Sequence, residues 1–151
     1  MKKSVIFLNG PTCVGKTSIA KLLQAKLLPL PFMYISIDMM IDMMPEGINN
    51  WHGEQVLQGF WWKTTTNSKG FKISHIQLGP YAEKVCESLK DVALTLLNRG
   101  YNLIIDEICL MPGSFYSWQQ KLLPFNTLYV GLSADLEVLE QREALRDNRM
   151  V

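Results

Sequence analysis

The residues Gly10-Pro11-Thr12-Cys13-Val14-Gly15-Lys16-Thr17 fit the phosphate-binding pattern G-x-x-x-x-G-K-[ST] at every defined position. The apolar run at positions 4–9 has the length and composition of a strand. After the pattern, apolar residues recur at helical spacing from Ile19 to Leu27, until Pro29 stops the helix. This motif requires a strand before it and a helix after it, and a chance glycine-rich turn would have neither. The sequence therefore predicts a phosphate-binding loop.

The chemistry of such a loop follows from its backbone. Glycines allow the chain to curl so that several N–H groups point at one phosphate chain, and the following helix adds the positive end of its dipole. We expect a nucleoside polyphosphate to bind at residues 10–18, which are Gly10, Pro11, Thr12, Cys13, Val14, Gly15, Lys16, Thr17 and Ser18. Lys16 would neutralise the β- and γ-phosphates, and the Thr17 hydroxyl would ligate Mg²⁺. Without phosphate, we expect the Lys16 side chain to be exposed.

Composition limits the remaining possibilities. With 151 residues, 48% of them hydrophobic, the chain is long enough for one domain with a substantial core, and we expect a single domain over 1–151. A formal net charge of +1 gives no electrostatic case for nucleic acid or an anionic membrane as partner. No apolar stretch has transmembrane length. The three cysteines are widely spaced and odd in number, which favours reduced thiols in the cytoplasm.

Strand and helix patterns alternate along the chain. Strands are predicted at 32–37, 101–105 and 127–132, a hairpin at 60–66 and 71–76, and helices at 38–44, 82–97 and 134–149. Continuous apolar strands alternating with helices indicate a mostly parallel sheet covered on both faces. The sequence predicts an α/β fold, in three layers, of the phosphate-loop type.

In such a sheet, ligands bind at the carboxyl ends of the strands. Asp106 and Glu107 end the strand predicted at 101–105. Asp106 resembles the acidic residue that holds Mg²⁺ in phosphate-loop enzymes, and we expect it to have that role. The alternative is that Asp106 or Glu107 only caps the turn that follows.

Asp38 ends another predicted strand, at the start of a short helix. A carboxylate facing the γ-phosphate could accept the proton of an attacking hydroxyl, as the catalytic Asp of kinases does. The alternative is that Asp38 is the N-cap of the helix, and the two roles do not exclude each other. With the phosphate loop present, we favour the catalytic role. Asp42 would share its helix face.

Several of these segments together resemble the chloramphenicol phosphotransferase family, over nearly the whole chain and in the family's order. The matching segments are 6–10, Gly15-Lys16-Thr17, Ser36-Ile37-Asp38 through Pro45, Gly79-Pro80, Ile104-Ile105-Asp106-Glu107, 129–132 and 142–149. The last of these is similar to the family's arginine-rich lid, R-E-x-x-R-G-D-R. The Asp-containing segment and the lid are the more specific parts of the resemblance.

The resemblance implies a nucleotide-kinase-like fold and transfer of the γ-phosphate of ATP to a hydroxyl of chloramphenicol or a similar small molecule. It implies that Asp38 is the general base, that Lys16 acts in transfer, and that Arg142, Arg146 and Arg149 contact phosphates from a lid at about 142–151. Arginines suit the charge that develops on a transferred phosphoryl group. The alternative is a solvated helix end, because acidic residues lie among these arginines.

The chain also departs from the family pattern. The lid carries Asp147-Asn148 where the family has Gly-Asp, and residues 50–76 do not match well enough to carry over the acceptor. Four large aromatic residues in that region would suit an aromatic acceptor, yet such residues more often fill a core, which is the interpretation we favour. They are Trp51, Phe60, Trp61 and Trp62.

The family continues past the lid into a further strand and helix, and we expect this chain to lack both. The strand at 127–132 should then pair with the first strand on one side and form an exposed edge on the other, which would favour self-association. Two alternatives to the kinase remain at this stage. One is a truncated nucleotide-binding protein without catalysis, and the other is a toxin-type kinase with a nucleotide-sugar acceptor.

Overall fold

The computed structural model describes residues 3–68, 70 and 72–145. Its elements, in chain order, are β1 (Ser4–Asn9), α1 (Lys16–Lys26), β2 (Phe32–Ser36), α2 (Ile37–Asp42), β3 (Phe60–Thr66), β4 (Lys72–Leu78), α3 (Pro80–Asn98), β5 (Asn102–Glu107), α4 (Ser114–Leu122), β6 (Asn126–Gly131) and α5 (Leu136–Ala144). None of the helices in these ranges has both the length and the apolar character that crossing a bilayer requires.

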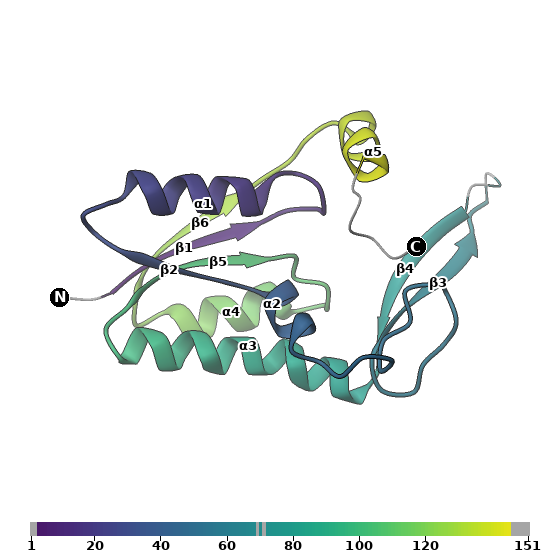
Figure 1. Cartoon of the computed structure of the whole chain (residues 1–151), viewed down its shortest axis with the longest axis horizontal. Coiled ribbons are helices and arrows are strands. Elements are labelled where there is room, and N and C mark those ends of the chain that lie inside the picture. The colour runs from purple at the N-terminus through teal and green to yellow at the C-terminus, as the bar shows by residue number, and fades with distance from the viewer. Residues whose placement is uncertain (1–2, 69, 71, 146–151) are drawn as a thin grey trace.

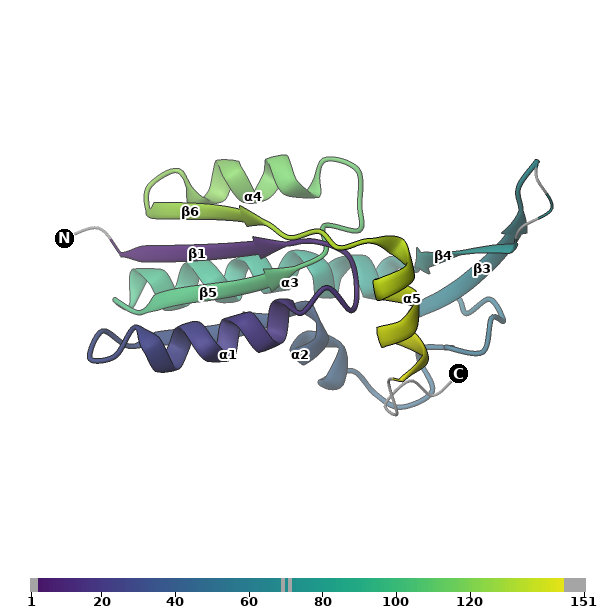
Figure 2. The same cartoon turned by 90° about the horizontal axis from the view of Figure 1, so that it is seen from above.

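Four parallel strands form the central sheet, in the order β2-β5-β1-β6. Helix α1 covers one face of this sheet, and α3 and α4 cover the other (Figures 1 and 2). The predicted three-layer α/β fold with a mostly parallel sheet is therefore confirmed. The predicted pairing of β1 with the strand near 127–132 is confirmed as well.

The continuous apolar character of the central strands follows from burial on both faces. In β5, Leu103 and Ile105 belong to the core cluster under α3 and α4, whereas Ile104 packs with Ala20 of α1. Successive side chains of a strand point to opposite faces, so a strand between two helical layers needs apolar residues at every position. Strand β5, with the acidic residues at its carboxyl end, is thus a buried inner strand of the sheet.

Strands β3 and β4 form a separate antiparallel hairpin, which extends away from the central sheet (Figure 1). The sequence predicts this hairpin, with its first strand at the observed positions and its second strand at 71–76, where the structure has Lys72–Leu78. At its base, Trp51 stacks on Phe60 with ring centroids 6.0 Å apart and lies 6.4 Å from Trp62. Phe60 is fully buried, but Trp51, Trp61 and Trp62 are only partly buried. The core interpretation is therefore correct for Phe60 and only in part for the three tryptophans.

Helix α4 is an element that the sequence analysis did not predict. Its inner face carries Trp118 and Leu122, which are buried against the sheet. The Trp118 ring lies edge-on to Phe7 of β1, with centroids 5.3 Å apart. Trp118 is thus a central contact between α4 and the sheet.

Replacing Trp118 with Ala is expected to lower the free energy of unfolding by about 3–5 kcal/mol, because it leaves a large cavity in the core. Tyr116→Ala on the same helix is the matched control, since Tyr116 is largely exposed. Urea unfolding of both variants measures the difference. Equal stability of the two variants would show that α4 is not packed as described.

Candidate functional site at the carboxyl edge of the sheet

The loop after β1 has the backbone shape that phosphate binding requires. Cys13 and Gly15 both have positive φ, at 59° and 102°, so the chain curls before α1 begins. The start of α1 is fixed by a hydrogen bond from the Ile19 N–H to the Gly15 carbonyl. Gly10 is required for a different reason, because a Cβ atom there would lie 2.5 Å from the carbonyl oxygen of Leu132. The loop is therefore held between β1 and the segment after β6.

Lys16 lies across this loop and is buried, with 7% of its surface exposed. Its ammonium group donates hydrogen bonds to the carbonyl oxygens of Gly10 and Pro11, both at 2.9 Å. The expectation of an exposed Lys16 is therefore wrong. The physical reason is that a desolvated ammonium needs acceptors, and the curled loop presents its carbonyls to it. To bind the Lys16 ammonium, the phosphates of a nucleotide have to replace these two carbonyl oxygens.

Asp106 meets the phosphate loop from β5. Its Oδ2 accepts a hydrogen bond from the Thr17 hydroxyl at 2.9 Å, and its Oδ1 lies 3.9 Å from the Lys16 Nζ. The Tyr34 hydroxyl of β2 donates to the same Oδ2 at 3.0 Å. Burial raises the pKa of Tyr34, so that this phenol remains a protonated donor. Side chains from α1 and β2 thus hold the Asp106 carboxylate in place.

The oxygens of the Thr17 hydroxyl and the Asp106 carboxylate fit the coordination chemistry of Mg²⁺. The ion prefers hard oxygen ligands and is usually bound by one or two protein groups together with water and substrate phosphates. A hydroxyl and a carboxylate in direct contact match that demand. No group of three or more His, Cys, Asp or Glu that could bind a metal by itself occurs in the described ranges. Thr17 and Asp106 could contribute to a metal site whose other ligands are water and phosphate oxygens.

Glu107, the next residue of β5, points to the opposite face of the sheet. Its Oε1 accepts hydrogen bonds from the backbone N–H groups of Ile108 and Cys109, and its Oε2 accepts one from the Trp118 indole. Burial raises the pKa of this carboxyl group. The structure thus places the two acidic side chains on different faces of the sheet. Glu107 caps the turn, and Asp106 faces the phosphate loop.

Asp38 lies in the first turn of α2 but is not the N-cap. The cap is Ser36, whose hydroxyl accepts a hydrogen bond from the Met39 N–H at 3.3 Å. Ser36 is also the register partner of Asp106 across the β2–β5 pair. The capping alternative for Asp38 is therefore wrong, and Asp38 is an exposed residue of the first turn of α2, which begins where β2, the strand that borders Asp106, ends.

Helix α5 lies against the phosphate loop and carries the first arginine of the predicted lid. The Arg142 guanidinium donates to the carbonyls of Cys13 and Val14, at 3.3 and 3.4 Å. Next to it, Glu143 Oε2 accepts a hydrogen bond from the Cys13 thiol at 2.6 Å. Arg146 and Arg149, the other two predicted lid arginines, lie outside the described residues.

Removing the Glu143 charge is expected to strengthen ATP binding about two- to tenfold, because the carboxylate lies on the loop where a polyphosphate would place its own negative charge. Calorimetric titration of Glu143→Gln with ATP measures this effect. Glu140→Gln, an exposed residue of the same helix, is the control for a general charge effect. An unchanged or weaker affinity of Glu143→Gln would exclude competition between Glu143 and the nucleotide.

The structure brings Lys16, Thr17 and Asp106 into one contact network and places Arg142 on the same loop. Tyr34 and Glu143 were not identified from the sequence as members of this site. The alternation of side chains in β2 could have indicated Tyr34. Tyr34 lies two residues before Ser36, the last residue of the strand, so both side chains point to the same face of the sheet. No local pattern singles out Glu143, whose contact with Cys13 spans 130 positions of the chain.

Comparison with known proteins relates this chain to one family. A family model described as chloramphenicol phosphotransferase-like protein matches residues 3–151. Comparison with curated proteins gives no significant match.

Several solved structures share the fold at low sequence identity. A chain of the Pnkp1/Rnl/Hen1 RNA repair complex has a TM-score of 0.64 and 13% identity, over 97% of this chain and 38% of that one. A Chloroflexus aurantiacus protein described as a kinase has a TM-score of 0.60 and 18% identity, over 97% of this chain and 68% of that one. An unliganded sugar kinase from a Janibacter species has a TM-score of 0.56 and 15% identity, over 99% and 70%. At these identities the likeness shows the fold alone.

Proposed function

This chain belongs to the chloramphenicol phosphotransferase-like family, and on that premise we propose that it transfers the γ-phosphate of ATP to a hydroxyl group of a small molecule. Membership in the family supports a phosphotransferase of the kinase type. The use of ATP, the need for Mg²⁺ and the chloramphenicol-like acceptor are the parts that we propose. The first solved structure above is more than twice as long as this chain, which spans 38% of it.

The contact network of Lys16, Thr17 and Asp106 is the observation that carries the proposal. It joins a loop with the phosphate-binding pattern to a buried carboxylate at the end of the neighbouring strand. Thr17 and Asp106 would hold Mg²⁺, which supplies positive charge to the phosphates when it is bound. Lys16 would exchange its carbonyl partners for phosphate oxygens, and backbone N–H groups of residues 10–18 would bind the remaining oxygens.

Asp38 and Arg142 would act on the transferred group. As general base, the Asp38 carboxylate would take the proton of the acceptor hydroxyl while the oxygen attacks phosphorus. Arg142 would move from the carbonyls of Cys13 and Val14 to phosphate oxygens and stabilise the developing negative charge. By resemblance, Arg146 and Arg149 would do the same.

A screen of acceptors tests the proposed function. The protein is incubated with Mg²⁺ and ATP and with chloramphenicol, other hydroxylated antibiotics, nucleosides or sugar nucleotides, and mass spectrometry detects the added phosphate. A phosphorylated antibiotic is the expected result. Phosphorylation of sugar nucleotides alone would favour the toxin-type alternative. Measurable ATP binding without transfer to any acceptor would favour a non-catalytic nucleotide-binding protein.

We also propose that the protein self-associates through β6. This strand pairs with β1 on one side and forms the edge of the sheet in the described part of the chain, with Leu128 largely exposed. An edge strand offers unpaired backbone groups to another chain. Light scattering over a concentration series should show a rising average mass, and Leu128→Lys should reduce it. A concentration-independent monomer mass would contradict this proposal.

A further inference from the structure

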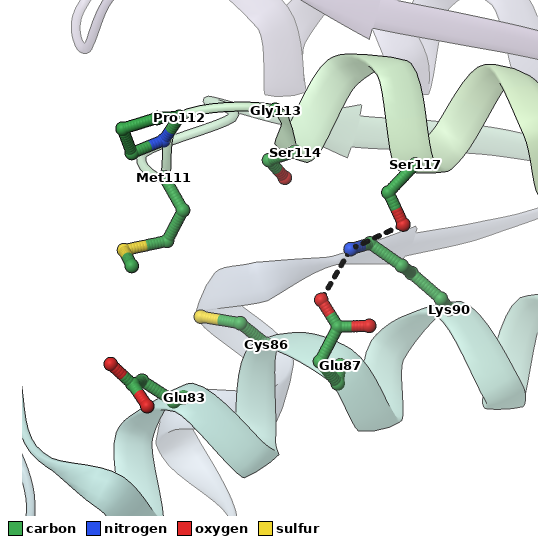
Figure 3. A pocket seen from close by; sticks show the side chains of 9 residues that line it. All are labelled: Glu83, Cys86, Glu87, Lys90, Met111, Pro112, Gly113, Ser114 and Ser117. Atoms are coloured by element: carbon green, nitrogen blue, oxygen red, sulfur yellow. Dashed lines mark hydrogen bonds and ion pairs between the residues drawn. The ribbon is translucent and has the colours of Figure 1, made fainter.

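A cavity of about 370 Å³ lies between α3 and α4 (Figure 3). These two helices cover the face of the sheet opposite α1 (Figure 1). Helix α3 contributes four residues at positions 83, 86, 87 and 90, which lie along one stripe of the helix. The loop before α4 and the first turn of α4 form the facing wall. The lining residues are Glu83, Cys86, Glu87, Lys90, Met111, Pro112, Gly113, Ser114 and Ser117. The volume is within the range of small-molecule sites in proteins.

The ammonium group of Lys90 is the central polar group of this cavity. Lys90 is a residue of α3 with only 3% of its surface exposed. Its Nζ donates to Glu87 Oε1 and to the Ser117 hydroxyl, the latter at 3.2 Å (Figure 3). An ammonium has three N–H donors and a hydroxyl can both donate and accept. The Lys90–Glu87–Ser117 group therefore offers donors and acceptors within one small space, as a ligand rich in hydroxyl groups requires.

Apart from Glu83, the rest of the wall is apolar or uncharged. Met111 and Pro112 lie on the loop side, across the cavity from Cys86 (Figure 3). Burial, and to a lesser extent the charge of Glu107, raises the pKa of the Cys86 thiol to about 12, so the thiol is neutral. Apolar surface of this kind can pack against the C–H face of a ring whose hydroxyl groups reach the polar side.

The net charge of the cavity determines which hydroxylated ligands it would favour. Glu83 and Glu87 are two carboxylates, and Lys90 is one ammonium, which leaves one net negative charge. Glu83 is exposed, so its carboxylate is accessible to a ligand that enters the cavity. A negative cavity favours an amine-bearing ligand and disfavours one that carries phosphate.

We propose that the cavity between α3 and α4 is a binding site for a small hydroxyl-rich molecule that carries a protonated amine. This site is separate from the phosphate loop. Asp106 faces the loop on one side of β5, whereas the cavity lies between α3 and α4 on the other side. The proposal does not depend on phosphoryl transfer. It concerns a second ligand of the same protein.

Nuclear magnetic resonance titration of the full chain tests the site, with glucosamine and glucose 6-phosphate as probes of one ring size and opposite charge. Glucosamine should shift the backbone amide signals of residues 83–90 and 111–117 with an affinity in the millimolar range, and glucose 6-phosphate should shift them much less. Because the readout is binding, it is independent of whether the protein phosphorylates anything. Shifts by both sugars alike, or shifts confined to other residues, would overturn the proposal.

A variant pair separates the cavity from general charge attraction. Glu83→Gln should weaken glucosamine binding about two- to fivefold, which is the usual range for one exposed ion pair. Glu54→Gln makes the same charge change at an exposed residue outside the cavity and should leave the affinity unchanged. Both residues are exposed, so both variants should fold. Equal affinities of the two variants would show that glucosamine does not bind beside Glu83.

Discussion

Lys16→Ala is expected to weaken ATP binding about 100-fold or more, because the variant loses the one side-chain ammonium that lies on the phosphate loop among the described residues. Calorimetric titration with Mg²⁺ and ATP measures the affinity. Lys21→Ala is the matched control, since Lys21 is an exposed residue of the same helix, α1. ATP affinity of Lys16→Ala equal to that of the control would show that residues 10–17 are not a working phosphate site.

The folded state of Lys16→Ala has to be checked, because the buried ammonium also joins the start of α1 to the beginning of the phosphate loop. Losing its hydrogen bonds to the Gly10 and Pro11 carbonyls is expected to cost about 1–3 kcal/mol of stability. Thermal melting without ligand should therefore show a lower midpoint but a cooperative transition. A variant that melts cooperatively and fails to bind ATP separates loss of the site from loss of the fold.

Asp38→Asn is expected to lower kcat roughly 10²–10⁴-fold, which is the usual contribution of a general base, with little change in ATP affinity. The structure makes this substitution a clean test. Since Ser36 is the N-cap of α2, the substitution leaves the cap of this helix in place. The amide keeps the shape of the side chain but cannot accept the proton.

Asp42→Asn is the control for this measurement, as it removes the same charge at the end of the same short helix. It should retain nearly full activity. Near-normal turnover of Asp38→Asn would reduce Asp38 to a structural residue. A large loss in Asp42→Asn alone would assign the base to Asp42 instead.

The fold and most of the site could be predicted because their signals are local in the sequence. The phosphate loop has fixed spacing, and the strands at its side are continuous apolar runs, so β1, α1, β5 and β6 were all predicted close to their observed positions. The contact between Thr17 and Asp106 was predictable from topology, because parallel strands bring their carboxyl ends to one edge.

Other features depend on contacts that the sequence does not show. Helix α4 was missed although Phe115, Trp118 and Leu122 have helical spacing, because the helix is short and no side-chain cap marks its start. Lys16 was expected to be exposed, but its burial follows from the particular curl of the loop around its ammonium. The Cys13–Glu143 contact joins two distant segments and has no sequence signature.

The most direct test of the proposed function is the fate of a labelled phosphate. The protein is incubated with Mg²⁺, a hydroxylated acceptor such as chloramphenicol, and ATP labelled at either the γ- or the α-phosphate. We predict a labelled product from γ-labelled ATP, none from α-labelled ATP, and none when the acceptor hydroxyl groups are acetylated. Label transferred from the α-phosphate, or no transfer to any hydroxylated acceptor by protein that binds ATP, would contradict a γ-phosphate transfer to a small-molecule hydroxyl.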